Sequence, residues 1–376
     1  MTHKLQTYLF AVINAILLAL SISLVQIIQF FIYPISKVSK PAFRLLIFLN
    51  TLPQYALIGL FEPEKWNIYT TQETFEKLGT ENSVALINHR YTCDFLYLLH
   101  IGFILEKVGH FFTMAKSSLK FAPVIGPMMF FQPTIFLKRS LEKDKANIQQ
   151  QLKNLKARYS KANNEYFSLG FYPEGTRFTD EKLALSNQLA ESKLSLPKND
   201  HLLHARPSGF QLIHDELSKG VSYYVILLRI RSELKQEAGP SFFDVFSKSN
   251  SEYFDIHIER YTQSDIDEIL AKHSASERPK FAAINQIWQH AETRMANYER
   301  TGIFPGERFI RKEFQRPRFI HYTMKLMGLF LAREIVMFFS IKTLLGMMIG
   351  MGFGIAMVLK SMNPALSSKK TFKKEK

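Results

Sequence analysis

The sequence has one cysteine, Cys93, among its 376 residues. A single cysteine excludes an intramolecular disulfide framework and any zinc module built from several thiolates. Internal repeats are absent, and the only low-complexity tract is a lysine-rich tail, so a repeat architecture is excluded as well. The fold must therefore be held by packing. The 47% of apolar residues supply enough material for a core and exclude a disordered chain.

Charge is missing from a long stretch near the start of the chain. No charged residue occurs between Leu5 and Ser36, and residues 9–35 are mostly Leu, Ile, Val, Ala and Phe. A helix of this length crosses the hydrocarbon core of a bilayer. A cleaved signal peptide is the alternative, but Pro34 and bulky residues stand where a small-residue cleavage site would be needed. We therefore expect an N-terminal membrane anchor.

Three further apolar stretches are less uniform. Residues 43–61 are interrupted by polar residues and proline, which fits a helical hairpin partner or an interfacial segment. Residues 322–341 contain three charges, so this stretch is either a span with paired charges or an amphipathic helix. Residues 343–359 are uncharged and carry glycines at every fourth position, a pattern typical of closely packed membrane helices. We expect two C-terminal spans.

The middle of the chain has a mixed composition in which short apolar runs alternate with longer helical patterns. This alternation predicts an α/β domain with a mixed sheet flanked by helices. We place the membrane anchor at 1–62, the α/β domain at 63–317, and the C-terminal membrane segment and basic tail at 318–376. The predicted strands are 84–87, 110–114, 134–137, 166–172, 221–230 and 253–258. The predicted helices are 94–107, 141–160, 264–272 and 281–300.

Cations exceed anions, giving a formal net charge of +15. Such a balance favours an anionic partner, which can be nucleic acid, phospholipid headgroups or a phosphorylated molecule. No nucleic-acid-binding module and no basic patch interleaved with aromatic residues is present, so we do not expect a nucleic-acid partner.

A histidine and a carboxylate follow the first predicted strand, in the stretch INHRYTCD at 87–94. Residues five apart point about 140° away from each other on one straight helix, so His89 and Asp94 cannot share a helix face. If His89 stays in the loop and Asp94 lies in the first helical turn, the carboxylate can accept the Nδ1 proton. Nε2 is then free to remove a proton from a hydroxyl.

Other interpretations of this stretch stay open. His89 can simply pack while Asp94 caps the helix that follows. A metal site made of His89, Cys93 and Asp94 lacks a further ligand cluster nearby, and we expect no metal. Nothing else in the sequence indicates that Cys93 is a reactive thiolate.

Two basic stretches also follow predicted strands. Pro173-Glu174-Gly175-Thr176-Arg177 combines a glycine that permits close backbone approach with an arginine that can bind phosphate through two hydrogen bonds. The structural alternative is a turn with a surface salt bridge. Phe136-Leu137-Lys138-Arg139 places two cations at a strand end, which can equally be solvated charges at a sheet edge.

Together these three stretches resemble the signature of the glycerolipid acyltransferases: an N-H-x4-D block, then F-x-x-R, then E-G-T-R. The likeness covers roughly residues 80–300. It extends toward the lysophosphatidic acid and lysocardiolipin acyltransferase branch through the stretches AKSSLK, FLKRSLEKDK, FYPEGTRFTDEK and HLLHARPSGF. In the last of these the chain departs from the branch pattern Leu-Pro-Arg-Thr-x-Gly-Phe, because Ala205 replaces the proline and Pro207 follows Arg206. His204 likewise replaces a leucine.

The resemblance implies an acyltransferase that uses acyl-CoA and a lysophospholipid and needs no cofactor. It implies that His89 deprotonates the acceptor hydroxyl and that Asp94 holds the imidazole. The resemblance assigns substrate binding to a basic set and the turn beside it: Lys138, Arg139, Glu174, Gly175, Thr176, Arg177 and Arg206. The retained Arg177 favours lysophosphatidic acid as acceptor. Lysocardiolipin and lysophosphatidylinositol are alternatives, and so is a catalytically silent lipid-binding membrane protein.

The tail and the flanking charges give expectations about location. Residues 373–376 resemble a dilysine retrieval signal of the endoplasmic reticulum, although a polybasic segment that contacts anionic lipid is the alternative. Lys37, Lys40 and Arg44 place the flank of the first apolar run in the cytosol by the positive-inside rule. We expect a multi-pass membrane protein of the endoplasmic reticulum whose α/β domain faces the cytosol.

Overall fold

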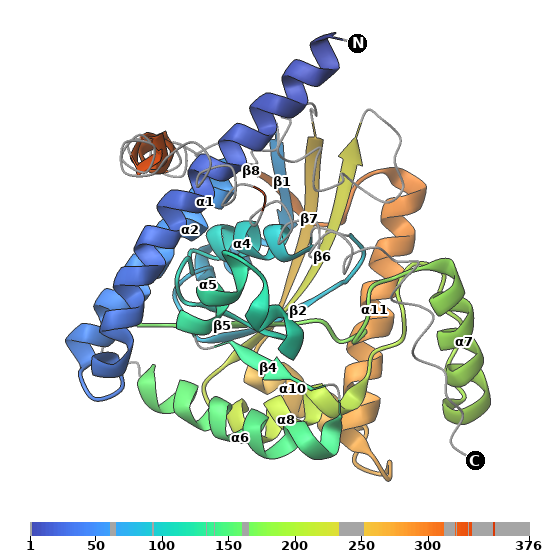
Figure 1. The fold of residues 1–376 in the computed structure, drawn as a ribbon. Helices are drawn as coiled ribbons and strands as arrows, with labels where there is room; N and C mark the ends of the chain where they lie inside the picture. Colours follow the sequence, from blue (N-terminus) through green and yellow to red (C-terminus); the bar gives the residue numbers. More distant parts are fainter. Residues whose placement is uncertain are drawn as a thin grey trace, which may run out of the picture.

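A computed structural model of the chain describes residues 2–60, 65–91, 94–132, 134–138, 140–159, 165–232, 252–311, 320, 322–329, 331–332 and 349. Its centre is one eight-stranded mixed sheet (Figure 1). The strands are β1 (Lys65–Thr70), β2 (Ser83–Ile87), β3 (Phe111–Lys116), β4 (Ile135–Leu137), β5 (Ser168–Phe171), β6 (Ser222–Ser232), β7 (Glu252–Tyr261) and β8 (Glu307–Arg311). Their order is β4-β3-β5-β2-β6-β7-β1-β8.

Five neighbouring strands of the sheet are parallel, and this part of the sheet positions the site. β4, β3, β5, β2 and β6 all run in one direction, with Leu86 of β2 paired to Phe171 of β5 and Thr113 of β3 paired to Gly170 of β5. β7 pairs antiparallel to β6, and β8 pairs antiparallel to β1. Because the carboxyl ends of parallel strands meet at one edge, the loops after β2, β4 and β5 lie along the same edge.

The helices lie on both faces of the sheet. They are α1 (Thr2–Ser36), α2 (Lys40–Leu60), α3 (Gln72–Lys77), α4 (Asp94–Ile104), α5 (Ile125–Phe131), α6 (Leu141–Arg158), α7 (Asp180–Leu194), α8 (Pro207–Leu217), α10 (Gln263–Lys272) and α11 (Pro279–Thr301). A short 3-10 helix, η1, spans Ser117–Phe121.

Alternating strand residues build two cores. Val84 and Leu86 point into the core shared with α6, α8, α10 and α11. Ala85 and Ile87 point into the opposite core, shared with α1, α2, α4 and α5. Side chains alternate across a strand, so a strand that is buried on both faces reads as a continuous apolar run, as β2 does. The result is the mixed α/β fold that the sequence predicts.

α1 and α2 lie side by side along one flank of the molecule (Figure 1). Val12–Ser36 and Lys40–Gly59 are long and apolar enough to cross a membrane. More than half of the apolar stretch of α2 is buried. The polar residues that interrupt its apolar pattern make buried contacts with the α/β domain. Asn50 and Gln54 donate hydrogen bonds to Gln132 at 3.5 and 3.2 Å, which ties α2 to the end of α5. α2 is therefore a hairpin partner docked on the α/β domain.

The C-terminal region is described only in part. Residues 322–329 are helical, Met324 is buried in the core shared with α1, and Gly328 lies so close to Leu17 of α1 that a larger residue would not fit. The segment 343–359, apart from residue 349, and the basic tail lie outside the described residues. The number of C-terminal spans and the domain boundaries stay predictions.

All six predicted strands and all four predicted helices are present, with ends shifted by a few residues. Two strands and four helices of the described residues were missed: β1, β8, α3, α5, α7 and α8. Among the described strands, β8 lies at the edge of the sheet, and β1 lies between β7 and β8. Both are short, and their sequences KWNIYT and ERFIR mix charged residues with apolar ones. Such strands give a weak period-2 signal.

Candidate active site

His89 and Asp94 meet in the loop between β2 and α4. The loop leaves β2 at Ile87, and Asp94 is the first residue of α4. Asp94 Oδ2 lies 2.5 Å from His89 Nδ1. The backbone N–H of Tyr91 donates to both carboxylate oxygens of Asp94 at 3.1 Å, which curls the loop between the two side chains. A carboxylate at Nδ1 favours the tautomer with its proton there and leaves Nε2 as the proton acceptor.

Three neighbours fix the loop and the ring. The side chain of Asn88 bonds to both backbone groups of Leu228 on β6, accepting at 2.8 Å and donating at 3.2 Å. The hydroxyl of Tyr91 accepts from the backbone of Ile230 at 2.9 Å. The ring of Tyr172, directly after β5, stacks on the His89 ring with 4.2 Å between centroids. The imidazole therefore has a defined orientation at the carboxyl edge of the sheet.

Glu174 connects the loop that holds His89 to the loop that holds Leu203. Glu174 is 2% exposed, and its two carboxylate oxygens accept from the backbone N–H of His89 at 3.0 Å and of Leu203 at 3.4 Å. Burial raises the pKa of Glu174 to about 8, although these two hydrogen bonds act to lower it. Burial also raises the pKa of Asp94, although its hydrogen bond to His89 opposes the shift. Carboxyl groups held where charge is disfavoured are characteristic of functional sites.

Gly175 and Arg206 are in direct contact. Gly175 has a φ of +68°, and a Cβ atom there would lie 2.8 Å from Cδ of Arg206. The backbone N–H of Arg206 donates to the carbonyl of Pro173 at 2.7 Å, and its side chain is exposed. Pro207 is the first residue of α8. The backbone N–H at this position has no partner within a helix, so a proline, which lacks the N–H, fits there directly after Arg206.

Thr176 and Arg177 complete the turn after β5, and both are partly buried. The carbonyl of Arg177 accepts from Nζ of Lys182 at 3.0 Å. The positive charge of Arg177 also favours ionised Asp94, so it lowers the pKa of that carboxyl against the effect of burial. Arg177 and Arg206 therefore give the edge beside His89 a positive charge.

Lys138 lies farther along the same edge. It follows β4, its side chain is exposed, and its backbone N–H donates to Asp144 at 2.8 Å. Three strand spacings separate β4 from β2, or about 14 Å. Among the residues that the structure describes, no hydrogen bond or ion pair joins Lys138 to the loop at 88–91, and Arg139 lies outside them. Cys93, which the metal alternative needs, lies outside them too. The roles of all these residues stay predictions.

Sequence reasoning missed the residues that hold the Arg206 loop. The carboxylate of Glu292 on α11 accepts from three consecutive backbone N–H groups, at residues 200–202, at 2.7 to 3.0 Å. Trp288 donates from Nε1 to the carbonyl of Leu203 at 2.9 Å. The pattern of α11 indicates an ordinary amphipathic helix, and the partners of a buried Glu are not visible in sequence. Tyr172 was missed as well, although its place at a strand end next to Glu174 is a signal.

The fold and the site define an α/β protein with a hydrogen-bonded histidine–aspartate pair beside a basic turn, a geometry that suits general-base chemistry. The Acyltransferase family model matches residues 67–195. Among similar proteins, the 1-acyl-sn-glycerol-3-phosphate acyltransferase delta of Bos taurus is 30% identical over 240 residues, 63% of this chain and 58% of the relative. The human delta protein is 29% identical with the same coverage, and the mouse gamma protein is 30% identical over 66% of this chain and 61% of the relative.

Over the matched residues the chain is therefore similar to the Acyltransferase family and to 1-acyl-sn-glycerol-3-phosphate acyltransferases. The matched part spans 58 to 61% of the length of these relatives.

Proposed function

We propose that the protein transfers an acyl group from acyl-CoA to the sn-2 hydroxyl of lysophosphatidic acid, giving phosphatidic acid and free CoA. The observation that carries this proposal is the contact between Nδ1 of His89 and the buried carboxylate of Asp94, beside the basic turn after β5. The names of the relatives support the acceptor class.

In the proposed reaction, Nε2 of His89 takes the proton of the acceptor hydroxyl as its oxygen attacks the thioester carbonyl. Asp94 stabilises the imidazolium that forms. The tetrahedral intermediate collapses with breakage of the C–S bond, and the CoA thiolate leaves and takes up the proton. No acyl-enzyme is needed, because a thioester is already an activated acyl donor, and catalysis then consists mainly of positioning two substrates and stabilising the oxyanion.

The acceptor phosphate would bind at the basic turn. Arg177 and Arg206 lie beside His89, and Gly175 lets the backbone and the guanidinium of Arg206 approach closely. Guanidinium groups match phosphate oxygens in charge and geometry. With its pKa at about 8, Glu174 is mostly uncharged at neutral pH and does not repel the phosphate. Lys138 and Arg139 would contribute charge farther along the edge.

The proposal is tested with full-length protein in detergent, labelled oleoyl-CoA and a panel of acceptors. The panel contains lysophosphatidic acid, lysophosphatidylinositol and monolysocardiolipin. We expect acylation of lysophosphatidic acid by the wild type and its loss in His89→Ala. His290→Ala is the control, because His290 is an exposed histidine on α11. Undiminished acylation by His89→Ala would refute the mechanism, and folded wild type that acylates no acceptor would favour a silent lipid-binding protein.

We also propose that the protein is a multi-pass membrane protein of the endoplasmic reticulum with the α/β domain in the cytosol. Two apolar helices support membrane association. An even number of spans after residue 317 would return the tail to the cytosol. Protease treatment of intact microsomes should remove an epitope tag at the C-terminus, and a protected tag would contradict this topology.

A further inference from the structure

The connection from β3 to β4 presents large apolar side chains to the outside of the molecule. Phe121 at the end of η1 is 86% exposed, Phe130 on α5 is 47% exposed, and Leu119 is 39% exposed. These three residues form what we call the η1–α5 patch. Single exposed apolar side chains are common on soluble proteins, but a group of large ones marks an interaction surface.

The η1–α5 patch is held in place by α1. Val124, between η1 and α5, has a φ of +65°, a conformation that a β-branched residue adopts only under constraint. Its carbonyl accepts from Nε2 of Gln26 on α1 at 2.6 Å. The ring of Tyr33 on α1 packs on Phe130 with 5.0 Å between centroids. α1 therefore holds the turn at Val124, which follows Phe121 by three residues, and the ring of Phe130.

The patch continues an apolar surface on α1. Ile27, Phe30 and Phe31 of α1 are 56, 67 and 71% exposed, within the helix that is apolar enough to cross a membrane. Lys116 and Lys120 flank the patch and are exposed. Apolar rings surrounded by lysines suit the boundary between anionic headgroups and acyl chains.

The patch also lies at the catalytic edge. η1 begins directly after the carboxyl end of β3, and β3 runs parallel to β5 and β2, whose carboxyl ends lead to Glu174 and His89. We propose that the η1–α5 patch inserts into the headgroup and upper acyl region of an anionic phospholipid bilayer, as a second membrane contact beside α1. The consequence for catalysis rests on the proposed function: a lipid acceptor would reach His89 from the bilayer along this side.

The depth of Phe121 tests the insertion without reference to activity. The two native tryptophans, Trp66 and Trp288, are each 1% exposed, so the signal of an introduced tryptophan can be separated from theirs. Full-length Phe121→Trp is reconstituted into vesicles of phosphatidylcholine and phosphatidylglycerol with bromine on the acyl chains. We expect a blue-shifted emission, quenching by the brominated lipid and protection from aqueous iodide.

Glu268→Trp is the matched control. Glu268 is exposed on α10, which packs into the core on the opposite face of the sheet from α1. Its tryptophan should be quenched by iodide and not by brominated lipid. Iodide quenching of Phe121→Trp equal to that of Glu268→Trp would overturn the proposal, whether or not the protein proves to be an acyltransferase.

A second experiment tests the catalytic consequence. Phe121→Glu places a charge where the patch would enter lipid, and Phe121→Leu preserves an apolar side chain. With a long-chain acceptor in vesicles, we expect Phe121→Glu to lower the rate about tenfold and Phe121→Leu to change it little. With a short-chain acceptor that is monomeric in water, both variants should match the wild type. Equal losses with both acceptors would refute a role in reaching the bilayer.

Discussion

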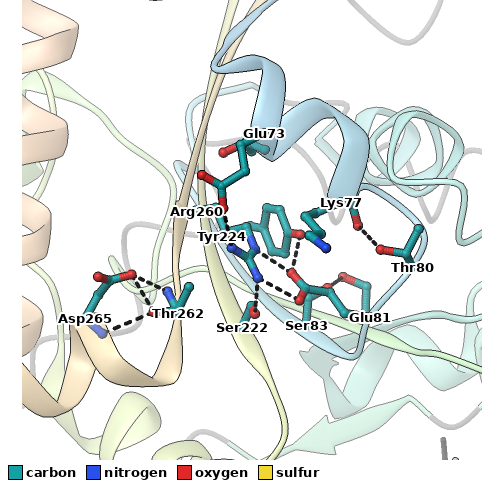
Figure 2. A network of polar contacts seen from close by, with 12 residues as sticks. Glu73, Lys77, Thr80, Glu81, Ser83, Ser222, Tyr224, Arg260, Thr262 and Asp265 are labelled. Atoms are coloured by element: carbon teal, nitrogen blue, oxygen red, sulfur yellow. Dashed lines mark hydrogen bonds and ion pairs between the residues drawn. The ribbon is translucent and has the colours of Figure 1, made fainter.

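Carboxyl groups at the two ends of the parallel strands are held in opposite electrostatic states. Glu81, at the amino end of β2, accepts hydrogen bonds from Arg260 at 2.7 and 2.9 Å and from the hydroxyl of Tyr224 (Figure 2). Burial alone would raise the pKa of Glu81, but the hydrogen bonds from Arg260 and Tyr224 outweigh it and lower the pKa. At the carboxyl end, burial dominates, and the pKa values of Glu174 and Asp94 are raised.

This difference separates a structural carboxylate from candidate functional ones. The network around Glu81 joins the amino end of β2 to β6 and β7, and its charges satisfy one another. Glu174 and Asp94 are buried beside an imidazole and backbone N–H groups, in a setting that disfavours their charged forms. Such a setting costs stability, and proteins retain it where the chemistry needs it. Substitutions at the two ends should therefore have opposite effects.

The largest effect is expected for Asp94→Asn. The asparagine keeps the shape of the side chain but removes the charge that stabilises the imidazolium, so kcat should fall about 10³-fold, or roughly 4 kcal/mol of activation free energy. Since burial already disfavours the charge, the free energy of unfolding should change by about 1 kcal/mol or less. Steady-state kinetics measures kcat, and thermal unfolding in detergent measures the change in stability. A variant with full activity would show that the Asp94 charge has no catalytic role.

At the amino end of the strands, Arg260→Met should lower stability and leave kcat nearly unchanged, the opposite of Asp94→Asn. The side chain of Arg260 is 12% exposed, and its removal leaves the carboxylate of Glu81 without its guanidinium. We expect a loss of about 2–3 kcal/mol in the free energy of unfolding with kcat within about twofold of the wild type. Arg300→Met, at an exposed position of α11, is the control and should alter neither. A fall in kcat for Arg260→Met would mean that the two ends are coupled.

Much of the loop between β2 and α4, the candidate catalytic loop, could be predicted from the sequence, because its elements are local. An apolar run followed by His89 and a helix that begins at Asp94 predicts the curl that brings the two side chains together. The order of strands and the long-range contacts could not be predicted in this way. The packing of Arg206 on Gly175 joins two loops 31 positions apart in the sequence, and the amide contacts of Asn50 and Gln54 with Gln132 depend on the docking of α2.

The third prediction concerns pH and Glu174. Its ordinary pKa is 4.5 and burial raises it to about 8. Between these values the folded state binds a proton that the unfolded state has lost, so this group makes the wild type less stable as pH rises, by at most about 1.4 kcal/mol per pH unit. Glu174→Gln lacks this dependence. Its stability relative to the wild type should rise by on the order of 1–2 kcal/mol between pH 5.5 and 7.5. Parallel thermal unfolding profiles for the two proteins would contradict the raised pKa.

The smallest effect is expected for Gly175→Ala, and a matched glycine makes it measurable. Gly175 and Gly220 both have positive φ values, +68° and +99°, so alanine should cost each about 1 kcal/mol in the free energy of unfolding. A Cβ atom at Gly220 would meet nothing within 4 Å, whereas at Gly175 it would push against Arg206. Only Gly175→Ala should therefore raise KM for lysophosphatidic acid, about three- to fivefold for a displaced guanidinium. If both variants raise KM equally, the contact with Arg206 does not position the acceptor phosphate, and strain alone explains the change.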